Sequence, residues 1–333
     1  MSPREQVKKS FRFEPVDKTP YWFTFDPEVG LRVDQYYGSA SWRDKIVPYM
    51  FGQHYGGYER EGEEKGTFHD VFGSIIGTGK MQYVIKTALS SPSLKGYRWP
   101  DPKEIEDWES VAKKYENNKD SYRVCGLGYG LFERAWLMRG MEQFLMDLGD
   151  HPEFAEELLE GITEFHLKSM DIIARKVPIE GYFGGDDWCD QRGCIMGPAL
   201  WRKFFKPRVA RLVNHCHELG FPYILHSCGN LLPLIDDLLE IGLDGLESLQ
   251  PEAMDIFLLK KKTRGKMVLI GGLGAQSTMP FGTPDDVRKT TKKLLTVMGQ
   301  GSGYVLAPAK PLLEDTPIAN AVALLETLLD DSK

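Results

Sequence analysis

The chain of 333 residues carries a net charge of −7, and 42% of its residues are hydrophobic. That size suffices for one large α/β barrel, a fold that commonly runs past about 250 residues. The acidic balance, without a cluster of Lys and Arg, argues against a nucleic-acid partner, and the lack of an apolar run of about 18 residues argues against a membrane span.

Strand-like apolar runs alternate with helical patterns along most of the chain. The predicted strands cover, in chain order, 20–25, a stretch within 66–90, 123–128, 181–185, 223–227, 245–250, 267–273 and 304–309. The predicted helices cover 131–147, 152–176, 198–219, 231–240, 253–263, 283–298 and 317–330. Strands separated by helices form parallel βαβ units, and eight such units close a (β/α)8 TIM barrel. The alternative is an open doubly wound sheet, but no clear glycine-rich phosphate-binding turn follows the first strand.

No linker or low-complexity tract divides the chain, which predicts a single domain over residues 1–333. Residues 1–120 are rich in aromatic, glycine and charged residues, as in the stretch YMFGQHYGGYEREGEEKG. We interpret them as an N-terminal helical cap with long loops over the mouth of the barrel.

The chain holds five cysteines, an odd number, and its first residues, MSPREQVKKSFRFEP, lack an apolar signal core. Both features predict reduced thiols and a cytoplasmic protein. The pair in CDQRGC (189–194) has no second pair to complete a structural zinc site, so plain thiols are the favoured interpretation. In NHCHELG (214–220), Cys216 belongs to an apolar helix face and the two histidines lie on the helix surface.

Polar and aromatic side chains gather where the predicted strands end. In chain order they are Asp186, Asp187, Trp188, His226, Cys228, Glu247, Tyr304 and Lys310. Active sites of barrels form at the carboxyl ends of the strands, so we expect these side chains to share one mouth.

His226 and Cys228 stand two residues apart in HSCGN. In a strand, such residues point to the same side, and imidazole and thiolate are preferred zinc ligands. Glu247, on the following strand, is the candidate third ligand. A catalytic zinc ion with three protein ligands keeps one open position. The alternative is a hydrogen-bonded histidine beside an inert buried cysteine.

The adjacent acids Asp186 and Asp187 are candidates for a general acid–base pair or a substrate clamp, and the alternative is that they cap the following segment. Five aromatic residues are candidates for an apolar substrate pocket, with a purely structural role as the alternative. They are Trp22, Phe25, Tyr129, Phe183 and Trp188.

Five segments of the chain together carry a family resemblance: FRFEPVDKTPYWF, ERAWLMRGMEQFLMDLGDHPEF, GGDDWCDQRGCIMGPALWRKFFKPR, LHSCGN and GSGYVLAPAKPLLEDTP. On these segments the chain resembles, over nearly its whole length, the uroporphyrinogen decarboxylase superfamily. The resemblance implies a (β/α)8 barrel. The R-Q-A-G-R-type and N-P-G-H-G motifs of the true decarboxylases are absent, and the corresponding segments read FTFDPEVGLR and GSGYVLAPAKP.

The H-x-C pair at 226–228 is similar to that of the zinc-dependent methyltransferases of this superfamily. Cobalamin-independent methionine synthase, similar here, adds a Glu, near Glu247, and a Cys in the last strand, where Tyr304 stands. The resemblance implies a His/Cys/Glu zinc site without a second thiolate. Such a site argues against the thiol-methylating coenzyme M branch and favours an oxygen leaving group.

The resemblance therefore predicts a methyltransferase that moves a methyl group from a methylated small molecule, such as an aryl methyl ether, to a corrinoid. The corrinoid is expected on a partner protein. Asp186 and Asp187 would position the substrate or its proton, and Tyr129 and Lys310 are further candidates for substrate contacts. The alternatives are a cofactor-free decarboxylase and a non-catalytic ligand-binding barrel. The oligomeric state is left open.

Overall fold

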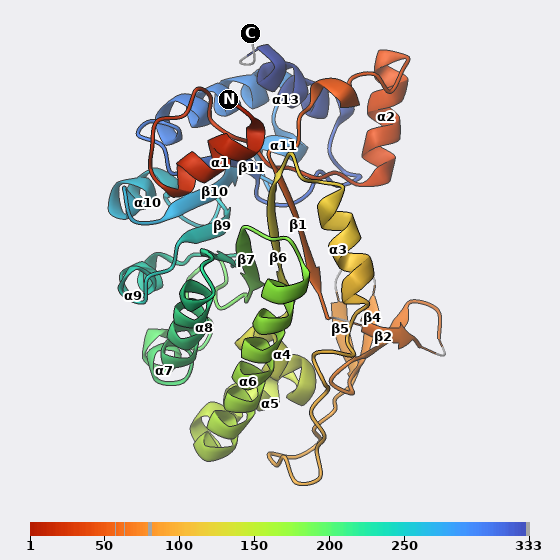
Figure 1. The fold of residues 1–333 in the computed structure, drawn as a ribbon, viewed down its shortest axis with the longest axis vertical. Coiled ribbons are helices and arrows are strands. Elements are labelled where there is room, and N and C mark those ends of the chain that lie inside the picture. Colours follow the sequence, from red (N-terminus) through yellow and green to blue (C-terminus); the bar gives the residue numbers. More distant parts are fainter. Residues whose placement is uncertain (57, 63, 79–81, 331–333) are drawn as a thin grey trace.

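The computed structural model describes residues 1–56, 58–62, 64–78 and 82–330 (Figure 1). Seven parallel strands lie side by side and curl into a barrel. Their order in space is β1 (Met50–Tyr55), β6 (Tyr122–Leu127), β7 (Gly181–Gly185), β8 (Tyr223–His226), β9 (Gly245–Leu249), β10 (Val268–Leu273) and β11 (Tyr304–Pro308). All interior positions of β10 and β11 are buried, as expected for parallel strands covered on both faces.

The eighth position of the barrel is taken by the segment 20–26. It forms isolated parallel bridges instead of a continuous strand, pairing Tyr21 with Leu306 and Phe25 with Leu312. The Trp22 amide donates to the Leu306 carbonyl at 2.8 Å, and the Leu306 amide donates to the Pro20 carbonyl at 2.8 Å. The (β/α)8 barrel predicted from the sequence is confirmed.

Helices follow the barrel strands and cover the outer face of the sheet (Figure 1). They are α4 (Leu131–Arg139), α5 (Met141–Asp150), α6 (Pro152–Lys176), α7 (Pro198–Phe204), α8 (Lys206–Glu218), α9 (Ile235–Glu240), α10 (Ile256–Thr263), α11 (Thr278–Phe281), α12 (Pro284–Lys293) and α13 (Ile318–Asp330). Two predicted helices are each divided in two. Gly140, with a φ of 93°, separates α4 from α5. Phe205 separates α7 from α8, just before a proline that lacks an amide hydrogen.

The strand predicted within 66–90 is wrong, because this region forms a separate antiparallel sheet. The sheet contains β2 (Tyr58–Glu61), β3 (Thr67–Asp70), β4 (Ile75–Thr78) and β5 (Gln82–Lys86), and it projects beside α3 (Trp108–Glu116) in Figure 1. The connections between these strands are far shorter than the dozen residues that a parallel crossover needs. The missing barrel strand is β1, which the sequence analysis had assigned to loops.

The N-terminal segment does not lie wholly over the mouth. Helix α1 (Pro3–Phe11) packs at the opposite end, where the strands begin, with Phe11 stacked on Tyr122 at 5.3 Å. Arg4 and Lys8 each hold the Glu180 carboxylate at 2.8 Å, just before β7. Helix α2 (Pro27–Tyr37) packs against α13. Helix α1 therefore closes the bottom of the barrel.

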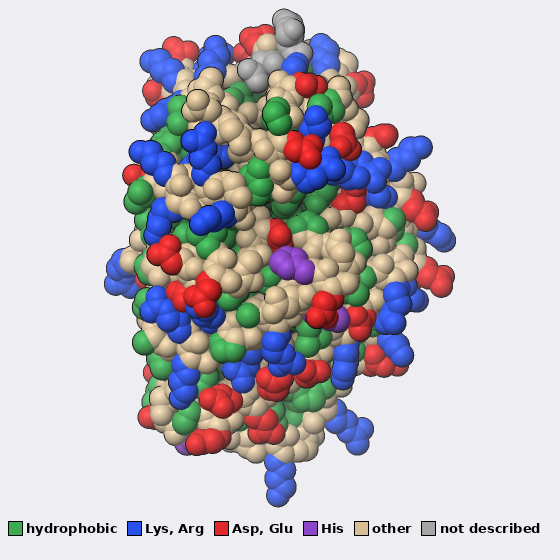
Figure 2. All heavy atoms as spheres, turned by 60° about the vertical axis from the view of Figure 1, so that its left-hand side comes forward, with side chains coloured by type: hydrophobic (Ala, Val, Ile, Leu, Met, Phe, Trp, Pro, Cys, Tyr) green, Lys and Arg blue, Asp and Glu red, His purple; other side chains and the backbone are tan. Residues whose placement is uncertain are grey.

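Acidic and basic side chains are interspersed over the face of the molecule shown in Figure 2. Among the described residues, no helix combines the length and the apolar character needed to cross a bilayer.

Candidate metal centre

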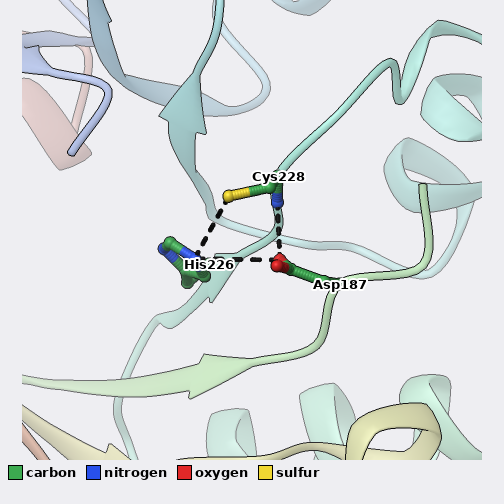
Figure 3. A group of neighbouring side chains, drawn as sticks. All are labelled: Asp187, His226 and Cys228. Atoms are coloured by element: carbon green, nitrogen blue, oxygen red, sulfur yellow. Dashed lines mark hydrogen bonds and ion pairs between the residues drawn. The ribbon is translucent and has the colours of Figure 1, made fainter. Parts of the chain in front are cut away.

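Three side chains with metal-binding atoms meet at the carboxyl ends of β7 and β8. The ligand atoms of Asp187, His226 and Cys228 all lie within 4.8 Å of one another (Figure 3). Among the described residues, this is the group of His, Cys, Asp or Glu side chains that could hold a metal ion. His226 Nε2 lies 3.7 Å from Cys228 Sγ and 3.8 Å from Asp187 Oδ1. One nitrogen, one sulfur and one oxygen thus face a common point.

Neighbouring strands bring these ligands together. His226 ends β8 and pairs with Gly185, which ends the adjacent strand β7. Asp187 lies in the loop only two residues after Gly185, so it comes close to His226. The Cys228 amide donates to Asp187 Oδ1 at 2.7 Å. Because β8 stops at His226, the loop, and not strand alternation, directs the thiol. Gly229 turns this loop with a φ of 87°, and the Cys189 carbonyl oxygen leaves no room there for a Cβ atom.

Glu247 lies behind the imidazole ring and not in the three-residue group. It pairs with His226 across β8 and β9, and its Oε2 accepts a hydrogen bond from His226 Nδ1. A carboxylate on the far nitrogen of a metal-binding histidine fixes the ring and its tautomer, and raises the basicity of the ligating nitrogen. This contact differs from the ligand role expected for Glu247.

The surroundings of His226 favour a positive charge. Burial alone would lower the pKa of His226, but the charge and hydrogen bond of Glu247, together with Cys228, raise that pKa well above its usual value. The same acceptors would attract a divalent cation. Thiolate, imidazole and carboxylate are the ligands that zinc takes in proteins, so the donor set fits this metal.

A cavity of about 320 Å³ adjoins the group at His226. Trp22, Phe183 and Lys310, three of the predicted substrate contacts, line it together with His226 and Glu247. The Trp22 and Phe183 rings pack edge-on, with centroids 5.5 Å apart. The candidate ligands are accessible, since 32% of the His226 side chain and 39% of the Asp187 side chain are exposed.

His54 also lines this cavity, although the sequence analysis did not select it. It belongs to β1, and its ring packs on Phe183 with centroids 4.3 Å apart. Desolvation in the crowded barrel mouth and the nearby His226 lower the pKa of His54. Nδ1 lies 3.3 Å from the Leu127 carbonyl, which can only accept, so a neutral ring leaves Nε2 as an acceptor. The sequence did contain a sign of this strand, because the run ends in HYGG, the same pattern of a strand followed by glycines that is seen in GYFGG.

Asp186 points away from its neighbour and into the protein. It is 2% exposed, and its carboxylate accepts hydrogen bonds from the Phe132 and Glu133 amides at the start of α4 and, at 2.6 Å, from Trp188 Nε1. Burial outweighs these donors and raises the pKa of Asp186 to about 7. The approach requires Gly130, because a Cβ there would meet Asp186 Cγ at 2.7 Å. Asp186 thus caps α4, a helix that precedes it in the chain, and not the following segment as the sequence alternative held. It does not belong to the three-residue group.

Four of the predicted aromatic residues lie outside the cavity. Trp188 is 1% exposed and packs against Trp201 in the core. Tyr304 begins β11 at the closed end of the barrel, and its hydroxyl donates to the Gly271 carbonyl at 2.6 Å.

Phe25 and Tyr129 complete this set. Phe25 faces a separate aromatic pocket with Trp42 and Arg43. Tyr129 lies under the Arg134 guanidinium, 5.0 Å from the ring centroid. The sequence pattern at the strand ends did not show where these four side chains lie, because their burial depends on how the neighbouring helices pack.

Glu133, in the first turn of α4, is a second residue that sequence reasoning missed. Burial, followed by the negative charges of Asp187 and Asp186, raises the pKa of Glu133 to about 8. A carboxyl group that keeps its proton at neutral pH beside a candidate metal ligand can donate a hydrogen bond or a proton. Its position could have been noticed in the sequence, because Glu133 stands at the start of a helix that directly follows a barrel strand.

The histidines of NHCHELG are surface residues, as predicted. His215 Nε2 lies 2.9 Å from Asp171, and His217 Nε2 lies 2.7 Å from Asp244. Cys216 is 1% exposed and belongs to the core.

Comparison with known proteins gives consistent matches. A sequence profile of the uroporphyrinogen decarboxylase (URO-D) family matches residues 84–329. The methylcobamide:CoM methyltransferase MtbA of Methanosarcina acetivorans is 24% identical over 272 residues, which span 77% of this chain and 75% of the relative. MtaA of Methanosarcina barkeri, also a methylcobamide:CoM methyltransferase, is 26% identical over 131 residues, or 39% of this chain and 36% of the relative.

A methyltransferase from Methanosarcina mazei has the same fold. The two structures superpose with a TM-score of 0.77 at 18% identity, covering 100% of this chain and 99% of the other.

Proposed function

The chain belongs to the uroporphyrinogen decarboxylase family, and on that premise we propose that it is a zinc-dependent methyltransferase. It would move a methyl group from a small methylated molecule to the corrinoid of a partner protein. The group formed by Asp187, His226 and Cys228 at the barrel mouth carries this proposal. Two relatives of the chain carry methylcobamide in their names, which supports a corrinoid as the second reactant.

Each residue of the site has a distinct task in this proposal. Asp187, His226 and Cys228 would hold zinc, in place of the His/Cys/Glu set expected from the sequence. Glu247 would keep the His226 proton on Nδ1 and so leave Nε2 free for the metal. Bound zinc would supply a Lewis acid that stabilises negative charge developing on the leaving atom of the substrate.

The cavity walls would bind and orient the substrate. Trp22 and Phe183 present aromatic surfaces that exclude water, and Lys310 lies at the rim, where it would attract an acidic substituent. His54 Nε2 would accept a hydrogen bond from a substrate hydroxyl. Glu133 would donate the proton that a leaving phenolate takes up.

An aryl methyl ether is the substrate class that this site fits best. A cavity of about 320 Å³ is at the small end of the range for ligand pockets and suits a single substituted ring. At the end of β11 the cavity wall consists of Ala307, Pro308 and Ala309, none of which offers a thiolate. One thiolate with one carboxylate leaves zinc a stronger Lewis acid, which suits an oxygen leaving group.

Methylation of a small thiol is the second candidate, because both curated relatives are named as CoM methyltransferases. The two candidates require opposite assays. The first transfers a methyl group from a methoxylated phenol to reduced cobalamin, and the second transfers it from methylcobalamin to 2-mercaptoethanesulfonate.

The deciding experiment measures zinc content together with both transfer reactions, in the native protein and in His226→Ala. We expect one bound zinc ion, and methyl transfer that is lost with chelator or with the substitution and is restored to the native protein by added zinc. Absence of zinc after reconstitution would refute the proposal and favour the cofactor-free decarboxylase. Tightly bound zinc without either transfer would favour a ligand-binding barrel.

A further inference from the structure

Cys189 and Cys194 lie opposite each other in a small hairpin beside the candidate metal centre. They form an isolated antiparallel bridge. The Asp190 amide donates to the Gly193 carbonyl at 2.9 Å, and the Ile195 amide donates to the Trp188 carbonyl at 2.9 Å. These bonds flank the pair, so Cys189 and Cys194 occupy the narrow position of the ladder, where the facing residues share no backbone hydrogen bond.

This position suits a disulfide bond. Facing Cα atoms at the narrow position are roughly 4.5 Å apart, within the range of about 4.4–6.8 Å that disulfides span. The two thiols are close enough to shift each other's pKa, raising that of Cys189 and lowering that of Cys194. The remaining cysteines differ, since Cys125 and Cys216 are buried in the core.

The two sulfurs also differ in access. Cys194 is half-exposed, whereas Cys189 is 5% exposed. The hydrogen bond from Cys189 lowers the pKa of Cys194, which increases the fraction of reactive thiolate. The Met196 sulfur lies 3.3 Å from Cys194 Sγ. Cys194 is therefore the sulfur that reacts first with an oxidant. Cys189 is the second thiol, which displaces the oxidant from Cys194.

We propose that Cys189 and Cys194 form a reversible dithiol–disulfide pair that reacts with small-molecule disulfides. The Cys194 thiolate attacks the oxidant, forms a mixed disulfide and releases one thiolate. Cys189 then attacks the Cys194 sulfur, closes the intramolecular bond and releases the second thiolate. The two protons of the cysteines pass to the released thiolates, so the oxidant becomes two thiols and the pair loses two electrons.

The hairpin is joined to the metal-binding loops. Asp187 precedes Cys189 by two residues, and the Asn230 amide donates to the Asp190 carbonyl at 2.8 Å. The loop with Cys228 packs on the hairpin at Gly229, against the Cys189 carbonyl. A disulfide would hold the hairpin, and with it two candidate ligands, in one conformation.

Trypsin offers a direct assay, because Arg192 lies between the two cysteines. The reduced, folded protein is incubated with oxidised glutathione, the remaining thiols are alkylated, and the digest is analysed by mass spectrometry. We expect two peptides joined through Cys189 and Cys194, an intact mass lower by two hydrogen atoms, and full reversal by dithiothreitol. Protection of Cys125 and Cys216 from alkylation before denaturation shows that the protein stayed folded.

Matched variants test the assignment. Cys194→Ser and Cys189→Ser should each abolish the joined peptides, whereas Cys228→Ser, which removes the other half-exposed thiol, should retain them. Circular dichroism verifies that each variant folds. Absence of the bond in the folded native protein at every glutathione ratio, or a bond from either cysteine to Cys228, would overturn the proposal. The outcome is independent of zinc and of methyl transfer.

Discussion

Replacing Glu247 or Asp187 by its amide separates the two roles that the structure gives these carboxylates. Glu247→Gln removes the charge behind the His226 ring but no atom of the three-residue group. Loss of such an outer partner weakens metal binding about 10- to 100-fold, or by about 1.4–2.7 kcal/mol. Asp187→Asn replaces the carboxylate of a proposed ligand by a neutral amide, so we expect a loss of zinc affinity greater than about 100-fold.

Competition with a chromophoric chelator at neutral pH measures both affinities. Asp236→Asn is the matched control, because this carboxylate is 79% exposed, pairs with Lys262 and does not belong to the three-residue group. We expect its zinc affinity to equal that of the native protein. Circular dichroism verifies that the amide variants keep their fold.

The reasoning would be refuted by the reverse order. If Glu247→Gln abolished zinc binding while Asp187→Asn left it unchanged, Glu247 would be the third ligand, as the sequence resemblance implies. Equal and small effects would place the third ligand elsewhere.

Three further predictions concern buried groups. His166 is buried with its pKa lowered to about 4 by burial and Arg134, so between pH 6.5 and pH 4 only the unfolded chain takes up its proton. The free energy of unfolding should therefore fall as the pH is lowered through this window, and it should fall more steeply than in His166→Gln, by about 1.4 kcal/mol per pH unit. Urea denaturation at several pH values measures this free energy, and equal pH dependence in the two proteins would contradict the prediction. Arg134→Met should reduce the free energy of unfolding by about 3–5 kcal/mol, because it leaves Asp70, 0% exposed and 2.5 Å from the guanidinium, buried without its cation. Urea denaturation should show partial recovery on adding Asp70→Asn, and full stability of the single variant would exclude the buried pair. Tyr304→Phe should lower the free energy of unfolding by about 1 kcal/mol, because it removes the buried hydrogen bond from the Tyr304 hydroxyl to the Gly271 carbonyl. We expect no change in KM for the methyl donor, and a raised KM would place Tyr304 in the substrate site.

The sequence alone determined the barrel and the end of the barrel that carries chemistry. Apolar runs such as YILHS and MVLIGGL, each followed by a helical pattern, leave parallel strands as the arrangement that buries both faces. The carboxyl ends of such strands share one mouth, so His226 and Cys228 could be selected before any coordinates. The strand β1 was missed because MFGQHY stands in a region rich in glycine and charge, and His54 was missed with it.

Tertiary structure decided which side each polar group faces. Asp186 and Asp187 are adjacent in the chain directly after β7 ends at Gly185, yet one caps α4 and the other meets His226 and Cys228. The sequence favoured Glu247 as the third ligand, but the pairing of β9 with β8 placed Glu247 on Nδ1, behind the ring. Sequence spacing specifies the order of groups along a strand, whereas the choice between two ring nitrogens depends on the packing of neighbouring strands.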